Sequence, residues 1–260
     1  MMIGASTANL YPMKTEESLA QLVQAGFRRL EVFINTESEA TPTYARELRE
    51  RAQAYGAQIV AMHPYTSAFE PYLLYSAYIR RFEDGLKVYG QLFEAAAAMG
   101  ASYVNMHGDR VESVLPEEES IRRYEQLYDL GQTYGVTLLQ ENVLRYRASS
   151  VNFIRSMRRL IGDKAQFTFD SKQCARCGLK PVEVLDAMGQ GLRHVHISDQ
   201  NEHQDCLVPG KGNVDYDQLM AIMQQYGFSG DWMIELYRCN FSSVNQLVEG
   251  KNLLQKALKL

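Results

Sequence analysis

Short apolar stretches alternate along this chain with longer segments in which apolar residues recur every three or four positions. Within the short stretches the polarity changes at every residue. In 29–34, for example, Leu30 and Val32 share one face, and Glu31 and Phe33 share the other. The first pattern predicts β-strands, and the second predicts amphipathic helices. The expected strands are 3–6, 29–34, 58–63, 102–107, 137–141, 166–170, the start of 192–212, and 231–236.

A helical segment follows each strand, and glycine or proline separates many of the elements. The expected helices cover 15–26, 42–56, a long segment ending near 100, a segment from about 116, and 150–161, 181–188, 215–226 and 243–258. Strict alternation implies parallel strands joined by right-handed crossovers. Eight such units in 260 residues predict a single-domain (β/α)8 TIM barrel over 1–260. The alternative is an open doubly wound sheet, but no early strand is followed by Gly-x-Gly-x-x-Gly.

Charge and composition exclude several classes of protein. There are 27 basic and 31 acidic residues, which gives a net charge of -4. A chain with this charge has no general electrostatic attraction for a polyanion, so nucleic-acid binding is disfavoured. The N-terminal segment has neither the basic start nor the apolar run of a signal peptide, and no segment resembles a membrane span. We therefore expect a soluble cytoplasmic protein without membrane partners. The four cysteines fit a reducing compartment.

Four polar residues stand on the inward faces and at the C-terminal ends of the last four expected strands: Glu141, Asp170, His196 and Glu235. In a barrel these ends form the rim that carries the chemistry. A carboxylate inside a barrel costs several kcal/mol unless it is paired or bound to metal. The set predicts one divalent ion, Mn²⁺, Mg²⁺, Co²⁺ or Zn²⁺. The alternative is ordinary ion pairing with rim arginines such as Arg145 and Arg238.

Two further histidines close the third and fourth strands. His63 and His107 both stand at inward-facing strand ends, where substrate contacts are expected. His194 lies one pleat below His196 and is expected to be packed or to support a ligand. The connection 64–74 is long and aromatic, and it is either a lid or a segment packed over the barrel mouth.

Five motifs carry a family resemblance: ENV at Glu141, FTFDSKQ around Asp170, HVHISD around His196, PGKGNVDY at 209–216 and MIELY around Glu235. Over essentially its whole length the chain resembles the metal-dependent sugar isomerase/epimerase family with the xylose isomerase-like barrel. Its relatives include ketose 3-epimerases, hydroxypyruvate isomerase, inosose dehydratase and endonuclease IV. The resemblance implies that Glu141, Asp170, His196 and Glu235 bind the metal, and that Glu141 and Glu235 form the acid/base pair.

The implied reaction is proton transfer through a metal-stabilised enediolate of a small sugar or sugar phosphate. The alternatives are an inosose-type dehydratase, a sugar-binding barrel without turnover, and a metal nuclease of the endonuclease IV kind. A homodimer or higher homo-oligomer is possible, since barrels often associate through their helices.

Two departures from the family pattern bear on these alternatives. Gln173 replaces a histidine common in relatives, and 205–207 reads Asp-Cys-Leu where nucleases have Asp-x-His. A second and a third zinc would therefore lack ligands, which disfavours the nuclease. Gln173 is expected to bind a substrate hydroxyl. Lys172 is expected to orient a substrate oxyanion or to lie in an ion pair.

Overall fold

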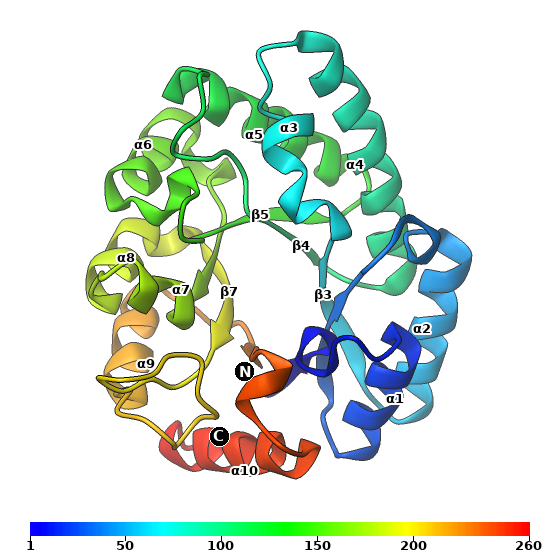
Figure 1. Ribbon diagram of the computed structural model, residues 1–260, viewed down its shortest axis with the longest axis vertical. Helices are drawn as coiled ribbons and strands as arrows, with labels where there is room; N and C mark the ends of the chain where they lie inside the picture. The colour runs from blue at the N-terminus through cyan, green and yellow to red at the C-terminus, as the bar shows by residue number, and fades with distance from the viewer.

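A closed ring of eight parallel strands forms the centre of the molecule, as the sequence predicts. The computed structural model describes residues 1–260. Each strand pairs with the next in chain order, and the last pairs with the first. Figure 1 looks into this ring, with the helices arranged around its outside. The strands are β1 (Ile3–Ser6), β2 (Arg29–Phe33), β3 (Gln58–His63), β4 (Tyr103–Met106), β5 (Thr137–Glu141), β6 (Phe167–Asp170), β7 (Leu192–Ile197) and β8 (Trp232–Ile234).

The α-helices connect the strands and form the outer layer. They are α1 (Thr15–Gln24), α2 (Pro42–Ala54), α3 (Glu70–Leu73), α4 (Ile79–Met99), α5 (Glu117–Thr133), α6 (Val151–Ile161), α7 (Ser171–Arg176), α8 (Pro181–Met188), α9 (Tyr216–Gln225) and α10 (Val244–Ala257). All the helices expected from the sequence are present. Two short ones, α3 and α7, lie in connections that were expected to be loops. No helix combines the length and the apolar character needed to cross a membrane.

Local sequence signals explain where the helices begin and end. Thr41 caps α2 by accepting a hydrogen bond from the Tyr44 amide, and Pro42 occupies the first turn, where its missing N–H costs nothing. Three glutamates occupy the first turn of α5, where the helix dipole favours negative charge. Gly100 ends α4 in the left-handed conformation that glycine adopts without strain.

The apolar core lies mainly between the ring and the helices. Leu30, Val32 and Val195 are fully buried on the outward faces of their strands. Inside the ring, at the C-terminal ends of the strands, ionisable side chains are buried instead of apolar ones: Glu141 is 2% exposed and His196 is 1% exposed. Buried charge is tolerated only where it is paired or coordinated, so this end of the barrel requires a separate explanation.

Candidate metal centre

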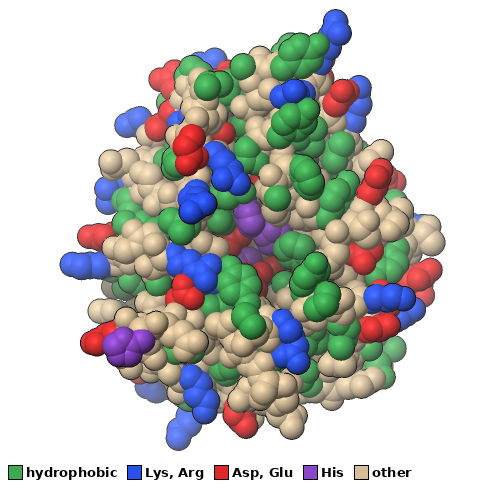
Figure 2. All heavy atoms as spheres, viewed as in Figure 1, with side chains coloured by type: hydrophobic (Ala, Val, Ile, Leu, Met, Phe, Trp, Pro, Cys, Tyr) green, Lys and Arg blue, Asp and Glu red, His purple; other side chains and the backbone are tan.

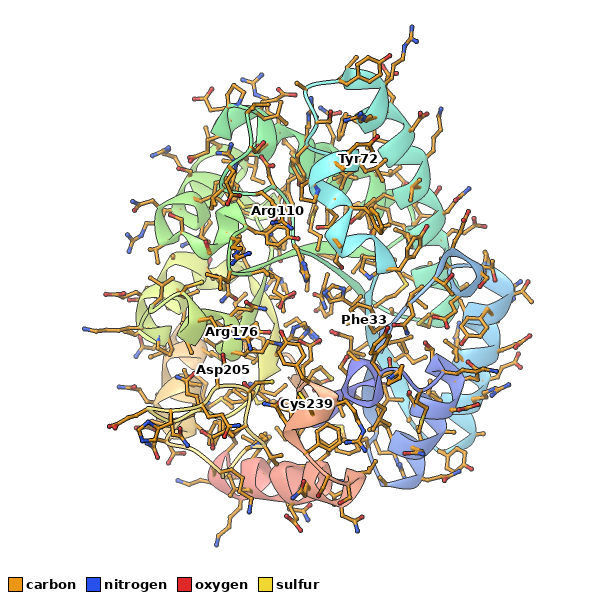
Figure 3. All side chains as sticks on the ribbon, in the orientation of Figure 1. Phe33, Tyr72, Arg110, Arg176, Asp205 and Cys239 are labelled. Carbon is orange, nitrogen blue, oxygen red and sulfur yellow. The ribbon has the colours of Figure 1, made fainter.

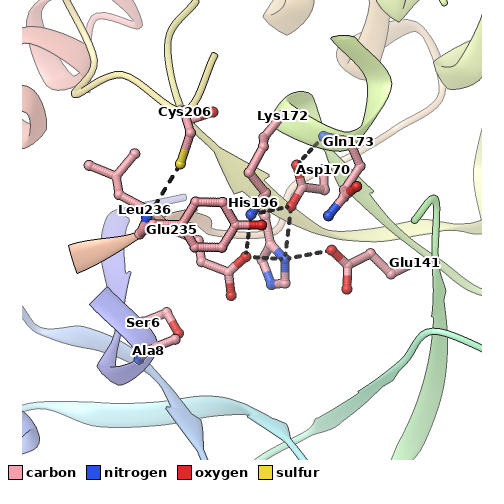
Figure 4. A network of polar contacts seen from close by, with 12 residues as sticks. Ser6, Ala8, Glu141, Asp170, Lys172, Gln173, His196, Cys206, Glu235 and Leu236 are labelled. Atoms are coloured by element: carbon pink, nitrogen blue, oxygen red, sulfur yellow. Dashed lines mark hydrogen bonds and ion pairs between the residues drawn. The ribbon is translucent and has the colours of Figure 1, made fainter. Parts of the chain in front are cut away.

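The four residues expected to bind a metal converge at the C-terminal end of the ring. Glu141 ends β5, Asp170 ends β6, His196 lies in β7, and Glu235 directly follows β8. One donor atom from each lies within 4.8 Å of all the others. The Nδ1 atom of His196 is 3.3 Å from Glu141 Oε1, 3.4 Å from Glu235 Oε2 and 3.8 Å from Asp170 Oδ2 (Figure 4).

These separations suit a small divalent cation. An ion about 2.1 Å from each of four tetrahedral donors holds those donors about 3.4 Å apart. In addition, Glu141 Oε2 is a buried oxygen that receives no hydrogen bond, and Asp170 Oδ2 has an ion pair with Lys172 Nζ at 3.2 Å but no hydrogen bond. Such atoms are costly unless a cation approaches them. Three carboxylates and one imidazole nitrogen are donors that Mn²⁺, Mg²⁺, Co²⁺ and Zn²⁺ accept, so the residues fit the ion expected from the sequence.

The alternative of ion pairs with rim arginines is wrong. Arg145 has an exposed side chain, and Arg238 donates to the Phe241 carbonyl oxygen instead. The cation that does contact these carboxylates is the buried ammonium group of Lys172. Of the two roles expected for Lys172, the structure therefore contains the ion pair.

A second layer of polar side chains lies beneath the ligands and holds His196. The Nε2 atom of His196 is 2.9 Å from Glu31 Oε2, so its Nδ1 atom faces the three carboxylates above. The same Glu31 oxygen is 2.8 Å from His194 Nε2 and accepts a hydrogen bond from Asn105 Nδ2 at 2.8 Å. His194 thus has the supporting role expected of it. The sequence analysis did not predict Glu31 as a site residue. A charged residue on the inward face of β2 was the signal that could have identified it.

Burial and neighbouring charges shift the acidities of these groups in different directions. Burial raises the pKa of Asp170, and the nearby Lys172 ammonium offsets this only in part. For Glu141, burial acts in the same direction, but His196 overrides it and holds the pKa well below its usual range. Burial also opposes ionisation of Glu31, and the two histidines beside it again lower its pKa. Glu31 and Glu141 are therefore carboxylates at neutral pH.

His63 and His107 lie where the sequence predicts, beside the other oxygen of Glu141. Glu141 Oε2 is 3.5 Å from His63 Nε2 and 3.6 Å from His107 Nε2. Burial lowers the pKa of His107 to about 3, so its ring is neutral at physiological pH and can bind a hydroxyl or a metal. These three residues form a second cluster able to hold a cation. The expectation that a second cation would lack ligands is therefore wrong for this cluster.

Local hydrogen bonds position Asp170. Asn142, in the ENV motif, donates to the Asp170 carbonyl oxygen and accepts from the Asp170 amide. Asp170 Oδ1 in turn caps α7 by accepting from the Gln173 amide at 2.8 Å, which leaves Oδ2 directed at the other ligands. The side-chain oxygen of Gln173 accepts from the Leu144 amide, and its amide nitrogen is free of protein partners. Asn142 is a site residue that the sequence analysis missed.

A cavity of about 370 Å³ opens above the ligands. His63, His107, Glu141 and Glu235 form part of its wall together with Lys172 and Gln173. Figure 2 shows histidine and acidic side chains at the bottom of the hollow in the centre of this face. The rest of the wall is largely apolar or aromatic and was not predicted from the sequence: Ala8, Tyr11, Phe33, Leu236 and Tyr237. Phe33 lies beside this opening in Figure 3.

Comparisons with known proteins agree with this architecture. A family model described as xylose isomerase-like TIM barrel matches residues 19–257. The uncharacterized protein ML2432 of Mycobacterium leprae is 24% identical, with 99% of this chain and 95% of that protein covered. A D-tagatose 3-epimerase-like protein has a TM-score of 0.81 at 19% identity, over 100% of this chain and 97% of that chain. A D-psicose 3-epimerase from Clostridium cellulolyticum H10 has a TM-score of 0.79 at 14% identity, with the same coverage. At these identities, the two structural similarities establish the fold.

Proposed function

Because the chain belongs to the xylose isomerase-like TIM barrel family, we propose that it is a divalent-metal-dependent isomerase or epimerase of a small sugar or sugar derivative. One observation carries the proposal. Three carboxylates and one imidazole nitrogen converge within 4.8 Å at the base of a cavity of about 370 Å³. A stable core does not require this arrangement, because three carboxylates are costly to bury beside the single ammonium group of Lys172.

The ion would be held by Glu141, Asp170, His196 and Glu235. When bound, it would polarise a substrate carbonyl and a neighbouring hydroxyl oxygen and make the adjacent carbon-bound proton more acidic. His63, His107 and Gln173 line the same cavity and would bind the remaining substrate hydroxyls. Similarity to solved structures described as sugar 3-epimerases supports the choice of a sugar as the substrate class.

Glu141 and Glu235 are the proposed acid and base. Figure 4 shows that these two carboxylates reach His196 from opposite sides. One carboxylate can therefore remove a proton from one face of the substrate, and the other can return a proton to the opposite face, which gives epimerisation. A single carboxylate that moves the proton between adjacent carbons gives aldose–ketose isomerisation. Because His196 lowers the pKa of Glu141, this residue is available as a base at neutral pH.

Hydrogen exchange at carbon tests this proposal. Purified protein with Mn²⁺ is incubated with a panel of ketoses in D₂O, and deuterium at the carbon next to the carbonyl is followed by NMR. Exchange together with formation of an isomer supports the proposal. Exchange with loss of water identifies a dehydratase, and tight sugar binding without exchange identifies a binding protein.

The cluster of His63, His107 and Glu141 favours one second candidate, a metal nuclease with more than one cation. The net charge of -4 opposes binding to DNA, and 205–207 still lacks the Asp-x-His ligands of a third cation. Incubation of the Mn²⁺- or Zn²⁺-loaded protein with an abasic duplex separates the two functions. Strand cleavage without exchange on any ketose would replace the isomerase proposal.

A further inference from the structure

Lys172 brings a positive charge to the same oxygen atoms that are expected to bind the metal. Its Nζ atom is 3.2 Å from Asp170 Oδ2 and 3.2 Å from Glu235 Oε2. The side chain is only 5% exposed, so water screens the ammonium group weakly. The ring of Tyr237 lies over the same group, with 5.0 Å between its centroid and Nζ. Figure 4 shows Lys172 between the two carboxylates.

Local structure holds the ammonium group in this position. Asp170 caps α7 with Oδ1, and Lys172 follows in the first turn of that helix. The sequence Asp-Ser-Lys-Gln therefore brings a metal ligand and a lysine to the same point. Asp170 ends β6 and Glu235 follows β8, and these two strands flank β7 in the ring. Lys172 consequently joins two ligands from different strands.

We propose that Lys172 is a built-in counter-cation that shares Asp170 and Glu235 with the divalent ion and weakens its binding. The inference rests on the metal site of the proposed function. A divalent ion that binds these oxygens must either displace the ammonium group or accept a like charge next to it, and both reduce affinity. In the metal-free protein, the same ammonium group offsets the repulsion among Glu141, Asp170 and Glu235.

Two of the three N–H groups of the ammonium face Asp170 and Glu235, so a contact with a substrate oxyanion would add to these ion pairs and would not replace them. A purely structural role, in which Lys172 holds Asp170 in place for the metal, makes the opposite prediction for affinity. Removal of the ammonium group should then loosen the ligands and weaken metal binding. The measured direction of the change in affinity therefore distinguishes the proposed role from the structural one.

The test is a calorimetric titration of the chelator-treated protein, residues 1–260, with Mn²⁺ alone. We expect Lys172→Met and Lys172→Gln each to bind Mn²⁺ about tenfold more tightly, or better, than the wild type. Without metal, both variants should unfold at a lower temperature than the wild type, and saturating Mn²⁺ should narrow that difference. Lys172→Gln retains a polar group at this position and covers the possibility that Lys172→Met folds poorly.

Arg176→Gln is the matched control. Arg176 lies on the same helix and also contacts the Tyr237 ring, but it is exposed and pairs with Asp205 rather than with a ligand (Figure 3). This variant loses the same unit of charge, and its affinity for Mn²⁺ should remain near that of the wild type. An equal gain in affinity for Arg176→Gln would show a general charge effect and would overturn the proposed role of Lys172.

The remaining outcomes separate this inference from the metal site itself. If the folded Lys172 variants bind Mn²⁺ no more tightly than a wild type that does bind it, the inference fails and the metal site stands. If neither the wild type nor the variants bind Mn²⁺, both the metal site and the inference fail. Binding by the Lys172 variants but not by the wild type supports the inference.

Discussion

At the scale of single residues, the candidate site depends on one imidazole ring held between two layers of carboxylates. Glu31 contacts Nε2 of His196 from below, and Glu141, Asp170 and Glu235 face Nδ1 from above. Against the effect of burial, the carboxylates around the ring raise the pKa of His196, and a cation bound at Nδ1 would replace the proton there while Glu31 keeps the one on Nε2. Glu31 therefore sets both the orientation and the basicity of the His196 ring.

Replacing Glu31 should therefore weaken metal binding although Glu31 need not touch the ion. We expect Glu31→Gln to reduce Mn²⁺ affinity by about 10- to 100-fold, as measured by calorimetry, because the His196 ring loses its anionic partner. Glu37→Gln removes an exposed glutamate nearby in the chain and serves as the control. Unchanged affinity in a folded Glu31→Gln protein would contradict this role.

The two proposed acid/base residues can be tested without removing their volume. Glu141→Gln and Glu235→Gln should each reduce deuterium exchange into the substrate by about 100-fold or more, because an amide cannot accept the proton and is also a weaker ligand for the proposed ion. NMR of the substrate in D₂O gives the rate, and circular dichroism checks the fold. Glu202→Gln, in an exposed loop, should exchange at the wild-type rate. Full activity in both site variants would refute the assignment.

At the scale of elements, the connection between β3 and α4 covers one side of the barrel mouth and is anchored by a buried carboxylate. Glu70, the first residue of α3, accepts hydrogen bonds from the Gly108 amide at 2.6 Å and from the Tyr89 hydroxyl at 2.7 Å. Phe69 and Tyr72 on the same segment are each 60% exposed. The segment is thus attached at Glu70, and it presents aromatic side chains to solvent.

Glu70 should make the stability of the protein depend on pH. Burial raises the pKa of Glu70 to about 7, so between about pH 4.5 and 7 the folded protein binds more protons than the unfolded chain. The free energy of unfolding therefore falls as the pH rises through this range. Relative to Glu70→Gln, which does not titrate, the wild type should lose about 3 kcal/mol between pH 4.5 and 7.

Urea denaturation of both proteins at several pH values across this range measures the difference. The comparison cancels contributions from the other titrating groups, since both proteins share them. Parallel stability profiles for the two proteins would show that Glu70 does not titrate in this window.

The elements also show what the sequence can and cannot reveal. Alternation along the strands was sufficient to predict the eight parallel strands and to bring Glu141, Asp170, His196 and Glu235 to one rim. It did not predict α7, since a helix of six residues depends on the cap that Asp170 provides. The contact between Lys172 and Glu235 could not be predicted from the sequence either, because it depends on how far each side chain extends across the ring.

At the scale of the whole molecule, the candidate metal centre joins four strands of the ring. An ion at this position would bind the folded protein, whereas the unfolded chain offers the same donors far apart in sequence. Ligands that bind only the folded state stabilise it in proportion to the logarithm of their concentration. The stability of the barrel and the occupancy of the site should therefore be linked.

Thermal unfolding with and without Mn²⁺ tests this linkage. At a free Mn²⁺ concentration 100-fold above the dissociation constant, the free energy of unfolding should rise by about 2.7 kcal/mol, and a chelator should reverse the gain. Asp170→Asn should show a much smaller increase, because it removes a charged ligand. An equal rise in the melting temperature of both proteins would place the stabilising ion elsewhere.

The closure of the ring by β8 against β1 determines when this site can exist during synthesis. Those two strands stand near opposite ends of the chain, and Trp232 donates its amide hydrogen to the Met2 carbonyl oxygen across the closing seam. Glu235 follows that seam directly. A nascent chain that has not yet released its last strand from the ribosome has an unpaired edge and lacks one of the four donors. Completion of the barrel and completion of the cation-binding set are therefore one event, which follows the release of β8 and Glu235 from the ribosome.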